Sequence, residues 1–210
     1  MFTGLIEAVG EVAERRPTSG GFRLRVATAL ASEVSTGDSV AVNGVCLTVI
    51  LADGKEIHAD IGPETARVTT LGAIERGAHV NLERPLGTDG RFGGHFVQGH
   101  VDGVGRVLER RHDAEFDWLT VGFPAALAPY LIPKGSIAVD GISLTVAGLA
   151  TDRFDIMVIP FTLEHTNLQY VHEGDSVNLE CDMVGKYVVR AAQLAGLALP
   201  ALGSTERTRG

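Results

Sequence analysis

A long internal repeat is the feature of this sequence that most constrains its fold. Residues 37–49, GDSVAVNGVCLTV, align without a gap on residues 134–146, KGSIAVDGISLTV. The runs PETARVTTL and GAHVNLE recur in the same register as PFTLEHTNL and GDSVNLE, and GLIEAVGEV near the start matches GHVDGVGRV. A period of about one hundred residues is that of a small domain rather than a solenoid repeat. The chain therefore encodes one domain twice, which predicts two similar pockets.

Composition excludes several classes of partner. The 210 residues suit two such domains, and the net charge of −8 without a basic run argues against nucleic acid or an anionic membrane. The start, MFTGLIEAVGEV, has no basic region or long apolar core of a signal peptide, and no apolar stretch is long enough to span a membrane. Two cysteines make no disulfide framework, so we expect a reduced, cytoplasmic setting.

Short β-type runs dominate both copies. The first copy contains FRLRVAT, SVAVNGVCLTVI, EIHADI and HVNLE, and the second contains DWLTVGF, SIAVDGISLTVAGL, FDIMVIP and SVNLE. Gly, Asp, Asn and Pro bound these runs, and many short strands with close turns indicate a closed barrel or a sandwich. Short helical turns are expected after Pro63, after Pro160 and within PAALAPYLI, and the glycine-rich residues 85–97 are the expected connection.

The pattern changes near the C-terminus. Residues 183–199, MVGKYVVRAAQLAGLAL, predict a helix whose polar side chains, Lys186, Arg190 and Gln193, form one narrow stripe. The apolar remainder requires burial on more than one side, either against the chain's own domains or at a subunit interface. The first copy has no equivalent helix, which favours an interface. The tail from residue 200 is expected to be disordered.

The matched strands present polar groups at equivalent places. Alternation along a strand puts the leucine and valines of VCLTV on one face, and Cys46 and Thr48 on the other. In the second copy Ser143 and Thr145 take the outward positions. Cys46 is either a small buried hydrophobe or a reactive group of a pocket. The serine at the matching position favours the pocket.

Three further side chains are ionisable in one copy only. His100 matches Leu5 and is a candidate acid or base, or a structural histidine. Lys134 matches Gly37 and is either a site residue or a solvated turn lysine. Asp182 follows the last strand of the second copy, where it is a site residue or a helix N-cap.

Neither a metal nor a nucleotide cofactor is expected. His95 and His100 are five residues apart, so on one strand they face opposite sides and share no metal. The sequence has no HExxH, no paired CxxC, no Walker loop and no convincing GxGxxG between strand and helix.

Several motifs together resemble a known family. MFTG, the NGVCLTV and DGISLTV pair, GGHFVQGH, and the PETAR and PFTLEHT pair resemble the riboflavin synthase family of α-chain type, over about residues 1–195. The resemblance implies an all-β fold of two similar six-stranded Greek-key β-barrels, from internal duplication, plus a C-terminal α-helix. It also implies a homotrimer with sites between subunits. The expected domains are 1–97 and 98–183, followed by an oligomerisation helix at 184–199 and a disordered tail at 200–210.

The same resemblance implies an activity. Enzymes of this family dismutate two molecules of 6,7-dimethyl-8-ribityllumazine, by transfer of a four-carbon unit, into riboflavin and 5-amino-6-(ribitylamino)uracil, without a metal or redox cofactor. One alternative is a non-catalytic lumazine- or flavin-binding antenna protein of the same fold, which would lack the catalytic side chains. Another is a flavin-dependent reductase, which would need a following nucleotide-binding domain.

The resemblance and the residue types together define the expected site. The catalytic candidates are Cys46, His100, Ser143 and Asp182, with His100 the first candidate for moving the acidic proton of the lumazine 7-methyl group. Phe161 departs from the pattern, because the first copy carries Glu64 there. The positions expected to line the substrate are Phe2, Gly4, Leu5, Ile6, Ser39, Cys46, Leu47, Thr48, Asp60, Ile61, Gly62, Pro63, Glu64, Thr65, Gly99, His100, Val101, Lys134, Ser143, Leu144, Thr145, Met157, Val158, Ile159, Pro160, Phe161 and Thr162.

Overall fold

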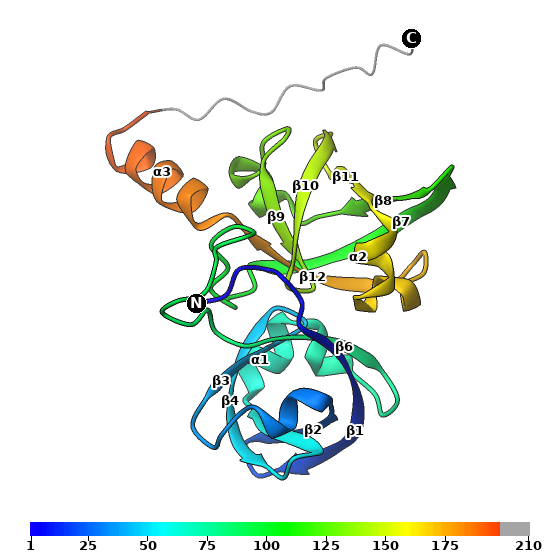
Figure 1. Cartoon of the computed structure of the whole chain (residues 1–210). Helices are drawn as coiled ribbons and strands as arrows, with labels where there is room; N and C mark the ends of the chain where they lie inside the picture. The colour runs from blue at the N-terminus through cyan, green and yellow to red at the C-terminus, as the bar shows by residue number, and fades with distance from the viewer. Residues whose placement is uncertain (198–210) are drawn as a thin grey trace.

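Two closed antiparallel β-barrels and one helix make up the chain (Figure 1). The computed structural model describes residues 1–197. The strands of the first barrel are β1 (Ala8–Thr18), β2 (Gly21–Ala27), β3 (Ser39–Val42), β4 (Val45–Ala52), β5 (Glu56–Ile61) and β6 (His79–Glu83). Those of the second are β7 (Gly103–Asp113), β8 (Phe116–Gly122), β9 (Ser136–Val139), β10 (Ile142–Leu149), β11 (Arg153–Val158) and β12 (Ser176–Cys181).

The two barrels have the same topology. Neighbouring strands follow the order β1-β2-β5-β4-β3-β6 in the first barrel, and the equivalent strands follow the same closed order in the second. Each barrel has its own apolar core, to which alternate residues contribute: in β2, for example, Phe22, Leu24 and Val26 are buried and the residues between them are not. The predicted all-β fold of two duplicated six-stranded barrels is confirmed.

Short helical turns connect the strands. The first barrel contains η1 (Ala29–Ser32), α1 (Pro63–Val68) and η2 (Thr70–Ala73), and the second contains η3 (Ala125–Tyr130), α2 (Pro160–Glu164) and η4 (Asn167–Tyr170). The turns predicted after Pro63 and Pro160 are present, because proline at the first helical position has the required φ and needs no hydrogen-bond partner. The glycine-rich connection, residues 85–97, contains no strand or helix.

The barrels meet at two tight turns. Asn43 and Gly44 join β3 to β4, Asp140 and Gly141 join β9 to β10, and all four have positive φ, as in type I′ hairpins. The turns touch so closely that a Cβ on Gly44 would lie 2.7 Å from the backbone nitrogen of Gly141. Both glycines are therefore required by conformation and by space.

Buried amides fix the barrels relative to each other. Asn81 Nδ2 donates to the carbonyl of Asp140 (3.0 Å), and Asn178 Nδ2 donates reciprocally to the carbonyl of Asn43 (2.8 Å). Asn167 breaks the symmetry, because its Nδ2 donates to Asp140 Oδ2 (2.9 Å). All five residues are buried, so each bond satisfies a group whose exposure to an apolar interior would be costly.

Helix α3 (Met183–Leu194) follows the second barrel. Asp182 caps it by accepting a hydrogen bond from the backbone N–H of Val184 (2.9 Å). The helix ends earlier than the expected segment 184–199, ahead of Gly196 with its positive φ. The tail expected to be disordered lies outside the described residues. Within residues 1–197, no helix is long and apolar enough to cross a membrane.

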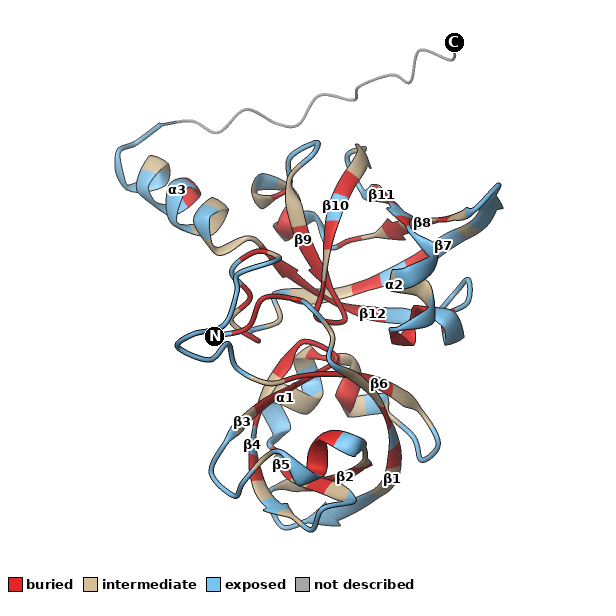
Figure 2. Cartoon of the chain, in the orientation of Figure 1, coloured by how far each residue is buried: buried red, intermediate tan, exposed pale blue. Residues whose placement is uncertain are grey.

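Most of the apolar surface of α3 is uncovered. Val189 is buried, whereas Tyr187 is 68% exposed and Val188 is 63% exposed, and Figure 2 shows pale blue and tan along most of the helix. Lys186, a member of the expected polar stripe, binds Asp102 just before the second barrel (2.6 Å). Packing against the chain's own barrels therefore accounts for only one side of the helix.

Candidate functional site

Strands β4 and β10 present the two candidate reactive groups in the same way. Cys46 and Ser143 are half-buried, Thr48 and Thr145 are exposed, and the intervening aliphatic residues are buried in the barrel cores. The predicted alternation is confirmed in both barrels. Thr48 also lies opposite Ser39 in the β3–β4 register, so two expected substrate-lining residues are neighbours.

Two segments far apart in the sequence run side by side between the barrels. Phe2 and Val97 form an isolated antiparallel bridge, with N–O distances of 2.7 and 3.2 Å. Just beyond this bridge, the backbone N–H of Ser143 donates to the carbonyl of Gly4 (2.8 Å). The N–H of Cys46 donates in the same way to the carbonyl of Gly99 (2.9 Å). The segment that leads into each barrel therefore borders the reactive position of the other barrel.

Only glycine fits at these two contacts. A Cβ on Gly4 would lie 2.7 Å from the Ser143 Cβ, and one on Gly99 would lie 2.5 Å from the Cys46 Cβ. Both residues also have positive φ, +77° and +81°. The expected lining segments therefore meet the expected reactive residues at backbone contact distance.

The exchanged segments border two equivalent surfaces, one on each barrel. We call the surface around Cys46, with Thr48 and residues 99–101, the first pocket. The surface around Ser143, with Thr145 and residues 4–6, is the second pocket. His100 belongs to the second sequence copy, yet its segment borders the first pocket. Position in the repeat alone does not reveal this crossing.

His95 lies against Ser143 at the second pocket, although sequence reasoning did not select it as a site candidate. Its Nδ1 lies 2.7 Å from Ser143 Oγ, and the residue is only 7% exposed. Among the described residues its Nε2 has no hydrogen-bond partner. Burial lowers the pKa of His95, and the negative charge of Asp182 opposes that shift only in part. The imidazole is therefore held neutral, the form that can accept a proton.

From the sequence, His95 is considered only as a metal ligand, and its spacing from His100 argues against that role. The pair of glycines before it is the one sequence feature that marks this segment as closely packed. A Cβ on Gly94 would lie 2.0 Å from the Thr3 carbonyl oxygen, so this glycine lets the segment pass against the N-terminal residues. Within residues 1–197, no group of three His, Cys, Asp or Glu side chains is arranged to hold a metal ion.

The rims of the two barrels differ in chemistry. In the first, Asp60 binds Arg23 (2.8 Å) and Glu64 binds Arg67 (2.6 Å), and these hydrogen bonds lower the pKa of both carboxyl groups. In the second, Phe161 replaces the acidic residue and stacks on His165, with ring centroids 4.0 Å apart. The first rim is therefore charged and the second is aromatic.

Lys134 and Asp182 have structural features of their own. Lys134 has φ +65° where the first barrel has Gly37 at +99°, so a lysine occupies a left-handed position better suited to glycine. Asp182 acts as the helix N-cap that sequence offered as its alternative role. The negative charge of Asp182 raises the pKa of His95, so Asp182 is close enough to act electrostatically on the second pocket.

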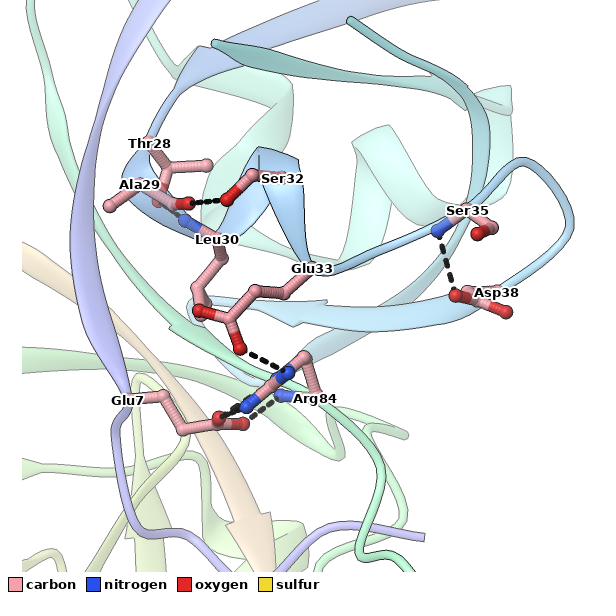
Figure 3. Close-up of polar contacts among 9 residues, drawn as sticks. All are labelled: Glu7, Thr28, Ala29, Leu30, Ser32, Glu33, Ser35, Asp38 and Arg84. Atoms are coloured by element: carbon pink, nitrogen blue, oxygen red, sulfur yellow. Dashed lines mark hydrogen bonds and ion pairs between the residues drawn. The ribbon is translucent and has the colours of Figure 1, made fainter. Parts of the chain in front are cut away.

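Different ion pairs lie at the equivalent ends of β6 and β12. Arg84 forms those at the end of β6, and Lys186 forms the one at the end of β12. Arg84 binds Glu7 (2.6 Å) and Glu33 (2.8 Å), as Figure 3 shows. In the second barrel Cys181 replaces Arg84, and Lys186 of α3 binds Asp102, the counterpart of Glu7. The end of the second barrel is thus tied to α3.

The chain has two clefts near these elements, one beside the N-terminal segment and one between the barrels. One of about 400 Å³ is lined by Leu5, Thr3 and Glu83, among others, and borders the N-terminal segment. Another of about 480 Å³ lies between the barrels, beside the stacked rings of His79 and Tyr170. Its lining includes no expected site residue.

Comparison with known proteins agrees with this architecture. Residues 3–85 and 98–182 match the lumazine binding domain family. Over 202 residues the chain is 44% identical to riboflavin synthase of Mycobacterium bovis, covering 93% of this chain and 100% of that protein. It is 40% identical over 191 residues to riboflavin synthase of Bacillus subtilis, covering 90% and 89%. The crystal structure of LumP complexed with 6,7-dimethyl-8-(1'-D-ribityl) lumazine has the same fold, with a TM-score of 0.79 and 23% identity over 86% of this chain and 99% of that chain. The chain therefore belongs to the riboflavin synthase family and is built from two lumazine binding domains.

Proposed function

We propose that this chain converts two molecules of 6,7-dimethyl-8-ribityllumazine into riboflavin and 5-amino-6-(ribitylamino)uracil by transfer of a four-carbon unit. The observation that supports this proposal most directly is the pair of equivalent pockets. Each pocket combines one barrel with the segment that leads into the other barrel. A reaction between two copies of one substrate needs two similar binding surfaces. Holding the two rings in register contributes much of the rate, because orientation is worth roughly 7–11 kcal/mol.

The second pocket holds the stronger candidate for proton transfer. Ser143 Oγ accepts the proton of the acidic 7-methyl group while it passes its own proton to Nδ1 of His95, 2.7 Å away. A neutral imidazole is suited to this step, and Asp182 stabilises the imidazolium that results. The carbanion left on the substrate delocalises into its ring. Sequence and family resemblance favour His100 for this role, whereas the hydrogen bond between His95 and Ser143 favours His95.

The first pocket receives the other substrate molecule. Cys46 and Thr48 present a thiol and a hydroxyl there, and the segment carrying His100 borders it. We propose that the remaining expected lining residues contact one substrate molecule or the other. Lys134 adds a cation beside the second barrel, where an unfavourable backbone conformation is retained.

We infer that the chain works as a homotrimer with sites between subunits. The support is apolar surface left uncovered in the single chain. Tyr187 and Val188 are exposed on α3, and Met157, Ile159 and Phe161 are exposed beside the second pocket. A neighbouring subunit would cover both surfaces and exclude water from the reacting rings.

The domain division proposed for the chain is 1–97, 98–183 and an oligomerisation helix from 184. The connection at residues 85–97, which has no helix or strand, and the two closed barrels support this division. In this division, the segment at the start of each domain, which carries Gly4 or Gly99, completes the pocket of the other domain.

The direct test is incubation of the purified chain with the lumazine, followed by flavin absorbance and by assay of the pyrimidine. The two products should appear in equal amounts, and chelator should not slow the reaction. His95→Ala should lower kcat by roughly 10²–10⁴-fold, the usual contribution of a proton-transfer group. Tight binding without turnover would favour the antenna alternative, and absence of binding would defeat both.

A further inference from the structure

Two buried carboxylates occupy equivalent places at the ends of the barrels. Glu83 ends β6 and Glu180 lies in β12, and they are matched in the repeat. Their exposed fractions are 3% and 2%. A buried carboxylate is costly unless several donors satisfy it, so each of these two has a structural or functional reason to be retained.

The donors that satisfy Glu83 are in the N-terminal segment. Its Oε1 accepts from the backbone N–H of Thr3 (2.6 Å) and from the Thr3 hydroxyl (2.8 Å). Its Oε2 accepts from the N–H of Gly4 (3.0 Å). Three donors therefore hold the segment at the residue whose carbonyl contacts Ser143.

Glu180 holds the second crossing segment in the same way. Its Oε1 accepts from the N–H of Gln98 (2.7 Å), and its Oε2 accepts from those of Gly99 (3.0 Å) and His100 (2.9 Å). Three consecutive backbone amides converge on one carboxylate. The carbonyl of Gly99 then accepts the N–H of Cys46.

Only an acceptor with two oxygens fits this geometry. A glutamine would turn an NH₂ group toward a backbone N–H in either amide orientation, leaving at least one donor unpaired. Hydrogen bonds to a charged acceptor are also stronger than neutral ones. Burial raises the pKa of both carboxyls, and the backbone donors oppose that rise by favouring the ionised form.

We propose that Glu83 and Glu180 are positioning residues that act across the barrels. Glu180, in the second barrel, sets the segment carrying His100 against the first pocket at Cys46. Glu83, in the first barrel, sets the Gly4 segment against the second pocket at Ser143. The assignment of substrate to these pockets rests on the proposed function, whereas the crossed mechanical coupling does not.

The thiol of Cys46 reports directly on the first pocket. Gly99 packs against the Cys46 Cβ, so release of its segment should uncover the thiol. Cys181 does not interfere, because it is buried and burial raises its pKa to about 12. Glu180→Gln should raise the rate of Cys46 modification by N-ethylmaleimide about tenfold, the effect of losing one charge-assisted hydrogen bond.

Glu83→Gln is the matched control. It removes an equivalent carboxylate but should raise the modification rate of Cys46 far less than Glu180→Gln does, because the Gly4 segment reaches Cys46 only through Phe2 and its bridge to Val97. Equal effects of the two variants, or an unchanged rate in Glu180→Gln, would overturn the proposal.

A measurement on the native chain keeps the test decisive if a variant does not fold. In a ¹H–¹⁵N spectrum followed over pH, the amide protons bound to Glu180 should titrate together, and those bound to Glu83 should titrate together separately. The neighbouring charges are Lys186 and Asp102 for Glu180, and Glu7 for Glu83. Amide protons that do not follow their carboxylate would contradict the positioning role.

Turnover supplies the functional readout. Glu180→Gln should lower kcat by about 10–100-fold, as misplacement of a site by an ångström does, while the pH dependence due to His95 stays unchanged. A shifted pH profile would instead put Glu180 in the proton-transfer machinery. The thiol and NMR measurements need no ligand, so they decide the positioning role even if the native chain fails to turn over the lumazine.

Discussion

At the residue scale, Lys134 holds a strained backbone conformation that a glycine would relieve. A left-handed backbone costs a lysine about 1–2 kcal/mol, and the first barrel avoids that cost with Gly37. Lys134→Gly should therefore raise the free energy of unfolding by about 0.5–1 kcal/mol, because the relief outweighs the extra entropy of glycine in the unfolded chain. The same change should weaken lumazine binding. Urea unfolding and a binding titration on one preparation would check both, and a less stable variant would contradict the strain argument.

His95 predicts an unusual pH profile. Burial lowers its pKa from the ordinary value of 6.5, so the imidazole stays neutral to more acid pH than a solvated histidine. If neutral His95 accepts the proton, kcat should hold through pH 6.5 and fall only as pH drops through the lowered pKa. The test is to measure kcat against pH for the native chain and for the Ser143→Ala variant, and to compare their acid limbs. A limb centred above 6.5 would rule out His95 as the base.

At the element scale, local pattern predicted the strands well and the crossing segments not at all. Alternation in VCLTV and the Asn-Gly turn are local signals, so the barrel faces and the hairpins could be read directly. The contact of Gly4 with Ser143 joins residues distant in sequence through backbone atoms, which leave no residue pattern. His95 was missed for the same reason, because its partner Ser143 is near only in the folded chain.

Asp140 makes the turn between β9 and β10 sensitive to pH. Complete burial raises its pKa from 3.8 to about 6, so the unfolded chain releases this proton at lower pH than the folded chain. Stability from this group is therefore full below pH 3.8 and is lost as pH rises through about 6, a loss of about 3 kcal/mol.

Asp140→Asn should remove that loss and resemble Asn43 of the first barrel. The difference in unfolding free energy between variant and native chain should change in favour of the variant by up to about 3 kcal/mol from pH 4 to pH 7.5, on top of a constant cost for the acceptor oxygen lost. Glu83 and Glu180 titrate in both proteins and cancel in the difference. Urea unfolding at the two pH values would measure it, and a constant difference would mean that Asp140 does not titrate in this range.

Helix α3 makes a prediction of its own. Its exposed Tyr187 and Val188 suggest an oligomer contact, whereas Lys186 ties the helix to the second barrel. Truncation before Met183 should give monomers or aggregates with little activity. Light scattering would report the mass, and an intact trimer after truncation would place the contact elsewhere.

At the scale of the whole molecule, duplication is the central feature, because two equivalent barrels with exchanged segments present two similar surfaces, one at Cys46 and one at Ser143. Sequence predicted the doubling, and the family resemblance supplied the reaction. The relative placement of the barrels depends on buried amides such as Asn81 and Asn178, which sequence gave no reason to single out.

The most direct measurement is the number of lumazine molecules bound per chain. His95→Ala, expected to bind without rapid turnover, would be titrated with 6,7-dimethyl-8-ribityllumazine by calorimetry. The account predicts two molecules per chain, one for each barrel. Saturation at one molecule per chain would contradict it, because one barrel would then have no substrate to hold.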